Sequence, residues 1–225
     1  MTKRGINLGC GKVILPCPRP AHHGLIPEAL YTDPNMAWDN ADWNALPGVN
    51  QVVDLFNYPW SLEDNSYDVA IATHIVEHIP HHIVLNGQFV HRHPDYQDGW
   101  FAWFGNLWRI MKPGGEVYIL SPYGFSNAGM SDPTHTRYLT LATFNYFDAP
   151  TNDSPFEYRM AQRWYVDMSG SIMFFHELAL QEAERIKASL GPGHQFDPEE
   201  FLRTDANRKL NTIVEMMVKL VAIKA

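Results

Sequence analysis

Cysteine, long apolar runs and excess positive charge are all scarce in this sequence, and each shortage excludes a class of protein. Cys10 and Cys17 are the two cysteines among 225 residues, too few for a disulfide-held scaffold, so we expect a reducing compartment. No stretch approaches the roughly 20 apolar residues that span a bilayer. Met1 to Arg4 lead into an expected strand without the apolar core of a signal peptide. We therefore expect a cytoplasmic protein with no membrane partner.

Basic residues are outnumbered by acidic ones. The chain has 17 Lys and Arg against 25 Asp and Glu, a net charge of -8 and a pI near 5.7. Binding through nucleic acid phosphates uses clusters of Lys and Arg, so nucleic acid is disfavoured as a partner, although a local basic groove is compatible with an acidic total. The length and a composition of 45% hydrophobic and 19% charged residues indicate one globular domain over residues 1–225.

Short apolar or β-branched runs alternate with longer segments. This alternation is typical of an α/β protein with a doubly wound, mostly parallel sheet and helical crossovers. The tail 212–224 suits a helix or a closing strand, and its β-branched residues favour the strand. The other expected strands are Lys3–Leu8, Gln51–Leu55, Tyr67–Thr73, Glu116–Ser121 and a short one within Trp38–Trp43.

Two segments predict helices. Trp100–Met111 repeats apolar residues at helical spacing and should bury Phe101, Phe104, Leu107, Trp108 and Met111. Residues 112–115, Lys-Pro-Gly-Gly, end it and reverse the chain. Phe174–Leu190 is the second helix. Residues 122–147 are too long for a simple connection, so we expect a substrate-binding loop region there.

Chemically useful residues recur where the expected strands end. Gly9 and Gly11 follow the first strand and allow a ligand to approach the backbone, although a plain tight turn is the alternative. Asp42, or its neighbour Asp39, follows the second strand, where a carboxylate can accept ribose hydroxyls. Asp54 closes the next strand, where a carboxylate can meet an adenine amino group. Their order predicts a nucleotide-like ligand.

Five segments together carry a resemblance to a known family. They are 7–11 (Asn-Leu-Gly-Cys-Gly), 52–55 (Val-Val-Asp-Leu), 63–68 (Glu-Asp-Asn-Ser-Tyr-Asp), 74–80 (His-Ile-Val-Glu-His-Ile-Pro) and 109–115 (Arg-Ile-Met-Lys-Pro-Gly-Gly). Over roughly residues 5–145 the chain resembles class I S-adenosylmethionine-dependent methyltransferases, particularly small bacterial and phage members. The resemblance implies a seven-stranded Rossmann-like sheet, S-adenosylmethionine as cofactor and S-adenosylhomocysteine as product.

The resemblance also implies roles for individual residues. The glycine bend would cradle the methionine end of the cofactor, Asp42 would take the ribose, and Asp54 with Leu55 would flank the adenine. The cofactor-binding residues implied are Asn7, Leu8, Gly9, Cys10, Gly11, Asp42, Trp43, Asp54, Leu55, Thr73 and His74. A helix is expected to begin near Ile75.

The chain departs from the family pattern after the glycine bend. Lys12 replaces the usual third glycine, and Pro16, Pro18 and Pro20 forbid a full helix there. Residues 13–36 therefore look like an insertion after the first strand, either a lid over the cofactor or substrate or a surface excursion.

The run His74-Ile-Val-Glu77-His78 reproduces the spacing of some zinc peptidases. A zinc peptidase needs this motif within a long helix, with a distal third ligand, whereas Pro80 interrupts here. We therefore expect no metal site. The Asn/Asp-Pro-Pro-aromatic sequence associated with nucleobase amino methylation is replaced by residues 72–75, Ala-Thr-His-Ile.

Asp132, His135 and Arg137 lie after the fourth expected strand and are the candidate catalytic residues. A sulfonium methyl group is already electrophilic, so catalysis requires chiefly alignment and exclusion of water. His135 is the expected general base, and Arg137 would hold an anionic group of the acceptor. Alternatively, the three residues tie the loop together. The sequence predicts methyl transfer to an oxygen or nitrogen of a small molecule or glycan; a nucleic-acid or protein methyltransferase and a non-catalytic binding module are the alternatives.

Overall fold

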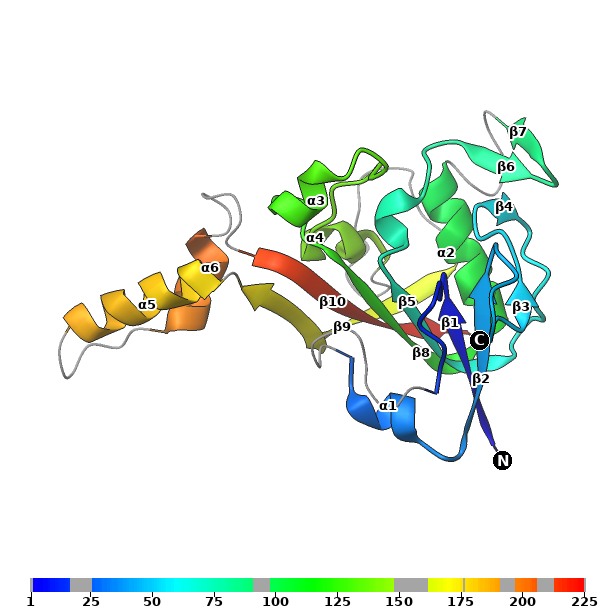
Figure 1. Cartoon of the computed structure of the whole chain (residues 1–225), viewed down its shortest axis with the longest axis horizontal. Coiled ribbons are helices and arrows are strands. Elements are labelled where there is room, and N and C mark those ends of the chain that lie inside the picture. The colour runs from blue at the N-terminus through cyan, green and yellow to red at the C-terminus, as the bar shows by residue number, and fades with distance from the viewer. Residues whose placement is uncertain are drawn as a thin grey trace.

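A seven-stranded sheet organises the molecule. The computed structural model describes residues 2–16, 26–90, 98–147, 162–175, 177–190, 197–205 and 213–224. The strand order is β3-β2-β1-β5-β8-β10-β9, and β10 runs antiparallel to both of its neighbours, β8 and β9 (Figure 1). The strands are β1 (Lys3–Leu8), β2 (Met36–Asp42), β3 (Gln51–Val52), β5 (Tyr67–Thr73), β8 (Met111–Pro122), β9 (Arg163–Phe175) and β10 (Ile213–Ile223). The predicted α/β fold with a mostly parallel sheet of seven strands is confirmed.

The strand predictions differ in accuracy. β1 and β5 have the predicted bounds, and the tail is the strand β10. The expected strand at 51–55 ends at Val52, because Asp54 accepts a hydrogen bond from the amide of Phe56 and turns the chain. β9 was not predicted. Its middle residues form a local turn in which Asp167 accepts from Gly170, and this turn breaks the two-residue period.

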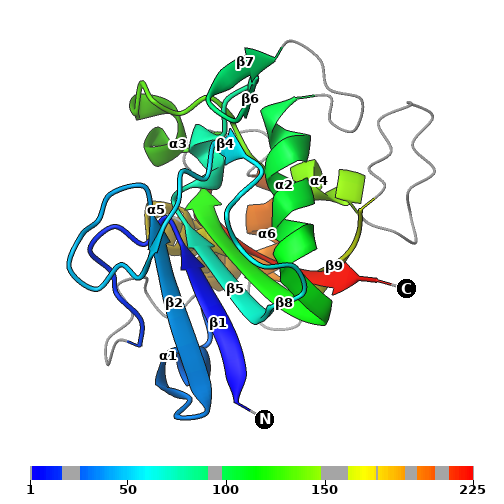
Figure 2. The same cartoon turned by 90° about the vertical axis from the view of Figure 1, so that its right-hand side faces the viewer.

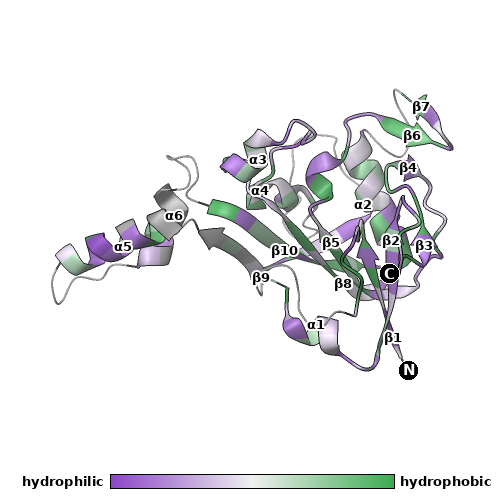
Figure 3. Ribbon diagram, in the orientation of Figure 1, coloured by the Kyte–Doolittle hydropathy of each residue, from purple (hydrophilic) through white to green (hydrophobic). Residues whose placement is uncertain are grey.

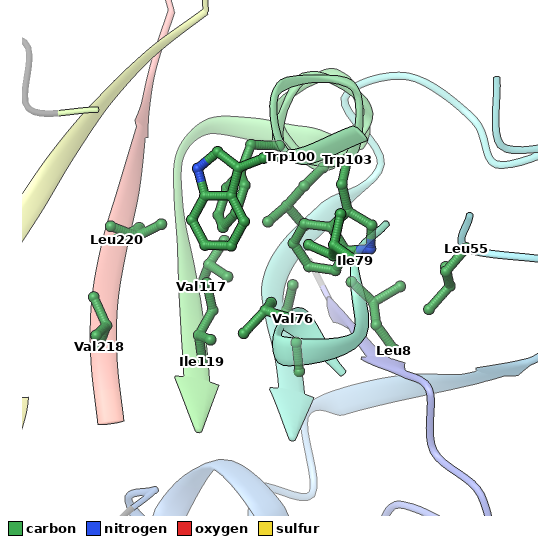
Figure 4. Packing of buried hydrophobic residues seen from close by; sticks show 14 of the residues in the cluster. Leu8, Leu55, Val76, Ile79, Trp100, Trp103, Val117, Ile119, Val218 and Leu220 are labelled. Atoms are coloured by element: carbon green, nitrogen blue, oxygen red, sulfur yellow. The ribbon is translucent and has the colours of Figure 1, made fainter. Parts of the chain in front are cut away.

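Helix α2 (Gly99–Ile110) covers one face of the sheet. Its deepest side chains are Trp100, Trp103, Phe104, Leu107 and Ile110, which pack on β5, β8 and β10 (Figure 4). The helix itself was predicted. Its buried face is rotated from the prediction, because Phe101 and Trp108 are only partly buried whereas Trp103 is fully buried.

The other face is covered by α1 (Glu28–Thr32) and the residues beside it. Ile26, Leu30 and Tyr31 pack against β5, β8 and β10 in a second apolar cluster. Figure 2 shows α1 and α2 on opposite sides of the sheet. This described part of the expected insertion therefore forms a crossover on the sheet. Residues 17–25 lie outside the described residues, so a lid there stays a prediction.

The turn expected at residues 112–115 lies within β8. Tyr67 pairs with Met111 but Val69 pairs with Glu116, so these residues form a bulge in the β5–β8 ladder. Gly114 has a φ of 73°, which only glycine adopts without strain. The reversal into the strand is consequently shorter than predicted, and β8 begins directly after α2.

Smaller elements gather beyond the carboxyl ends of the strands (Figure 1). A three-stranded sheet contains β4 (Asn57–Tyr58), β6 (Ile83–Leu85) and β7 (Gln88–Val90). The 3-10 helix η1 (Val76–His78) follows β5, in place of the longer helix expected near Ile75. The expected loop region 122–147 contains α3 (Asn127–Ser131), α4 (Leu141–Phe144) and η2 (Asn145–Phe147).

Helices α5 (Glu177–Ser189) and α6 (Pro198–Asp205) project from the end of the β9–β10 pair, away from the sheet (Figure 1). The predicted helix at 174–190 is confirmed for α5, but its first residues belong to β9. Figure 3 shows mostly apolar strands in the sheet, whereas α5 carries many polar residues. Among the described residues, no helix combines the length and apolarity that a membrane crossing requires.

Candidate functional site

A pocket of about 620 Å³ opens beyond the carboxyl ends of β1, β2 and β5. The strand order reverses between β1 and β5, and ligands of open α/β sheets bind at such a switch point. The size is within the range of small-molecule sites. The lining residues are Gly9, Asp42, Trp43, Val53, Asp54, Leu55, Phe56, Ile75, His78, Pro80, His82, Val84 and Thr134.

The glycine bend forms the inner wall of the pocket. Gly9 has a φ of 65°, and a Cβ there would lie 3.0 Å from Cδ1 of Ile75. Gly9 lines the pocket, whereas Leu8 is fully buried in the core. Asn7 donates to the carbonyl of Val13. Of the five predicted residues in this bend, Gly9 is thus the one on the pocket surface, and Asn7 fixes the chain behind it.

Asp42 and Asp39 have different environments. Asp42 is 6% exposed, lines the pocket and accepts from the amides of Gly11 at 2.9 Å and Asn44 at 2.9 Å. Asp39 instead pairs with Arg4 at 2.9 Å. Each carboxylate oxygen has a further lone pair, so Asp42 retains acceptor capacity toward a ligand.

Trp43, Asp54 and Leu55 all line the pocket. The Trp43 side chain is 73% exposed, and Leu55 is buried beneath the pocket. A flat indole and an apolar floor offer a planar ring two contacts. The structure thus brings the predicted ribose and adenine residues to one pocket with Gly9.

Thr73 and His74 do not line the pocket. Ile75 and His78, which follow them, do. His74 has a φ of 52°, which turns the chain so that its ring lies between two carboxylates. Nε2 is 3.2 Å from Glu215 of β10, and Nδ1 is 3.3 Å from Glu77. Glu215 and Glu77 together raise the pKa of His74 to about 9, so the ring is an imidazolium at neutral pH and joins β5 to β10.

The three predicted catalytic residues have distinct contacts. Arg137 donates to the carbonyls of Ile79 and Pro80 and to Asp98. Asp132 accepts from the amide and hydroxyl of Thr134. These contacts agree with the alternative to a catalytic role, in which Asp132 and Arg137 hold the loop region 122–147 together. Neither side chain lines the pocket.

His135 is partly buried beside the pocket wall, with 6% of its side chain exposed. Its Nδ1 lies 2.8 Å from the carbonyl oxygen of Gly129. Its ring makes an edge contact with the ring of His78, with centroids 4.8 Å apart. Because His78 lines the pocket, His135 stands one side chain behind its surface.

Sequence reasoning missed the wall formed by His82, Val84 and Thr134. His82 directly precedes β6, and Val84 lies within β6, the first strand of the β6–β7 hairpin. Asn86 and Gly87 form its turn with φ angles of 48° and 80°, and an Asn-Gly pair between apolar runs is a strong hairpin signal. That pair could have revealed the hairpin, but not that its first strand lines the same pocket as Gly9.

Comparison with known proteins identifies the fold. No family model and no curated protein matches the sequence. The structure is similar to that of a SAM dependent methyltransferase from Archaeoglobus fulgidus, with a TM-score of 0.51 and 18% identity over 98% of this chain and 86% of that one. A phosphoethanolamine N-methyltransferase from Haemonchus contortus, solved with S-adenosyl-L-methionine, gives a TM-score of 0.46 and 14% identity; this chain spans 49% of its length. The chain has the Rossmann-like fold of class I S-adenosylmethionine-dependent methyltransferases.

Proposed function

We propose that this protein binds S-adenosylmethionine in the pocket beyond β1, β2 and β5 and transfers its methyl group to an oxygen or nitrogen of a small molecule or glycan. The observation that carries the proposal is the convergence of Gly9, Asp42 and Asp54 on one pocket. These residues follow three different strands of a sheet with the methyltransferase fold.

In this proposal, different residues of the pocket contact different parts of the cofactor. Gly9 admits the methionine end, because a side chain there would meet Ile75. The Asp42 carboxylate accepts hydrogen bonds from the ribose hydroxyls. Trp43 and Leu55 contact the adenine ring, and Asp54 accepts from its amino group. The wall with His78, His82 and Thr134 is then left for the acceptor.

The reaction requires little covalent help from the protein. A lone pair of the acceptor forms a bond to the methyl carbon, the carbon–sulfur bond breaks, and its electrons stay on sulfur in S-adenosylhomocysteine. Any proton on the acceptor leaves to a base or to water. The protein contributes alignment of the two molecules and an environment with little water.

Calorimetric titration with S-adenosylhomocysteine tests the proposal. We expect saturable binding at one site. Asp42→Asn keeps the shape of the side chain but removes its charge, and should weaken binding roughly 10- to 100-fold, the range expected for a hydrogen bond to a charged group.

Asp39→Asn is the matched control, because Asp39 lies three residues away in β2 and pairs with Arg4. It should leave the affinity unchanged. Equal affinity in Asp42→Asn and the wild type would remove Asp42 from the ribose role, and no binding to the wild type would remove the function. Transfer of a labelled methyl group to a panel of hydroxyl and amine compounds then separates an enzyme from a binding module.

A further inference from the structure

Three side chains that the proposed cofactor contacts do not use converge beside the pocket. A nitrogen of His78, a nitrogen of His135 and a carboxylate oxygen of Glu77 all lie within 4.8 Å of one another. Glu77 and His78 belong to η1, whereas His135 follows α3. The cluster therefore depends on packing between two distant parts of the chain.

Glu77 lacks the hydrogen bonds that a buried carboxylate requires. The residue is 2% exposed, and neither Oε1 nor Oε2 accepts a hydrogen bond. His74 forms an ion pair with Oε1 at 3.3 Å. Among the described residues, Oε2 has no hydrogen-bond donor. A buried carboxylate oxygen without a donor or cation is costly, so the site favours a further positive group there.

Each of the two histidines has a hydrogen-bond partner at Nδ1. Nδ1 of His135 lies 2.8 Å from the carbonyl of Gly129, and Nδ1 of His78 lies 3.2 Å from the carbonyl of Thr134. A carbonyl can only accept, so each neutral ring carries its proton on Nδ1 and has its lone pair on Nε2. Metal-binding histidines are held in this way by a hydrogen bond from their other nitrogen. Asp132 is 3.8 Å from Nε2 of His135, too far for a hydrogen bond.

We propose that Glu77, His78 and His135 bind one divalent transition-metal ion of the Mn²⁺, Co²⁺ or Zn²⁺ class. Two imidazoles and one carboxylate favour such ions over Mg²⁺ and Ca²⁺, which prefer oxygen ligands. Three protein ligands leave coordination positions for water or a substrate. The motif at 74–78 is not that of a zinc peptidase, because it does not lie in a long helix. His135 as the third ligand is not visible in the motif, because that contact exists only in the folded chain.

The position of the cluster suggests what the ion does, and this part rests on the proposed methyltransferase function. His78 lines the pocket, so the ion lies at the wall that the acceptor faces. An ion held by Glu77, His78 and His135 would lower the pKa of a hydroxyl that binds it, so that the hydroxyl would give its proton to water more readily. That oxygen would then be the nucleophile for the methyl carbon, with the electrons of the carbon–sulfur bond left on sulfur. The acceptor is accordingly a hydroxyl compound.

The test is calorimetric titration of the untagged, metal-free chain with CoCl₂ and ZnCl₂. We expect one equivalent to bind. Glu77→Gln, His78→Ala and His135→Gln should each weaken binding about tenfold or more. His81→Gln is the matched control: His81 is an exposed histidine three residues after His78 and lies outside the cluster, so its replacement should leave the affinity unchanged.

The visible spectrum of the Co²⁺-loaded wild type gives a measurement that depends on no variant. A shift from the spectrum of hydrated Co²⁺ supports inner-sphere nitrogen ligation. The proposal is overturned if all four variants bind Co²⁺ and Zn²⁺ as tightly as the wild type does, or if the Co²⁺ spectrum does not shift. S-adenosylhomocysteine binding, measured without metal, separates the two hypotheses. Nucleoside binding without Co²⁺ or Zn²⁺ binding overturns the ion site alone, whereas metal binding without nucleoside binding supports the ion site and overturns the methyltransferase.

Discussion

At the scale of single residues, the glycine bend that lines the pocket also contains a thiol of low reactivity, that of Cys10. Cys10 lies between Gly9 and Gly11, is buried, and donates its amide to Ala41 of β2. Burial raises the pKa of the Cys10 thiol to about 11, and the negative charge of Asp42 adds to the shift. Because the thiolate is the reactive form, Cys10 should resist alkylation at neutral pH.

We predict this resistance for the Cys17→Ser variant, in which Cys10 is the remaining cysteine. The alkylation rate should rise with pH without a plateau below about pH 10, whereas the same chain unfolded in guanidinium should plateau above a pKa of about 8.5. Adding Asp42→Asn should lower the midpoint, because it removes a negative charge that disfavours the thiolate. A plateau near pH 9 in the folded protein would contradict the shift.

At the scale of elements, the N-terminus of α2 connects the core to the loop region. Asp98 caps the helix by accepting from the amide of Trp100 at 2.8 Å, and its other oxygen lies 3.1 Å from Nη2 of Arg137. Gly99 lies so close to the 79–82 segment that a Cβ would be 2.1 Å from the carbonyl oxygen of Pro80. The Asp98 carboxylate therefore holds both the start of α2 and the segment around Arg137, which follows Thr134 of the pocket wall.

Two substitutions at Asp98 separate these contributions. Asp98→Asn keeps a capping oxygen but loses the charge that Arg137 contacts, and should lower the free energy of unfolding by about 1 kcal/mol. Asp98→Ala loses the cap as well and should cost about 2 kcal/mol. Urea denaturation measures both. Equal losses would show that capping contributes nothing at this position.

At the scale of the whole molecule, the sheet and the projecting helices are separable. Phe175 ends β9 opposite Ile213 at the start of β10, and the two strands are antiparallel. Such neighbours can be joined by a hairpin turn of a few residues. β10 itself lies between β8 and β9 and buries Val218 and Leu220 in the core.

We predict that replacing residues 176–212 with a short Asn-Gly turn leaves a folded protein. Its thermal midpoint should shift by a few degrees, and its affinity for S-adenosylhomocysteine should not change, because none of the described residues between 177 and 205 lines the pocket. A chain that ends at Phe175 is the control. It lacks β10 and should fail to fold. Loss of nucleoside binding in the first variant would show that the projecting helices support the pocket.

Much of the fold and part of the pocket follow from local patterns. β1, β5, α2 and α5 were predicted because their apolar residues repeat at strand or helix spacing. Gly9, Asp42 and Asp54 were predicted because residues at the carboxyl ends of parallel strands meet at one edge, whereas Leu55 was implied by the family resemblance. β9 escaped prediction because Asp167 to Gly170 interrupt its period.

The sequence by itself thus determined that β1, β5, α2 and α5 form, and that Gly9, Asp42 and Asp54 lie at the ligand-binding edge, since both depend on neighbours along the chain. Tertiary structure alone decided that Asp39 pairs with Arg4 while Asp42 faces the pocket, that Arg137 is held by Asp98, and that His135 meets Glu77 and His78. These contacts join segments far apart in sequence. Their partners are set by how the layers pack around the core, and no spacing along the chain encodes that.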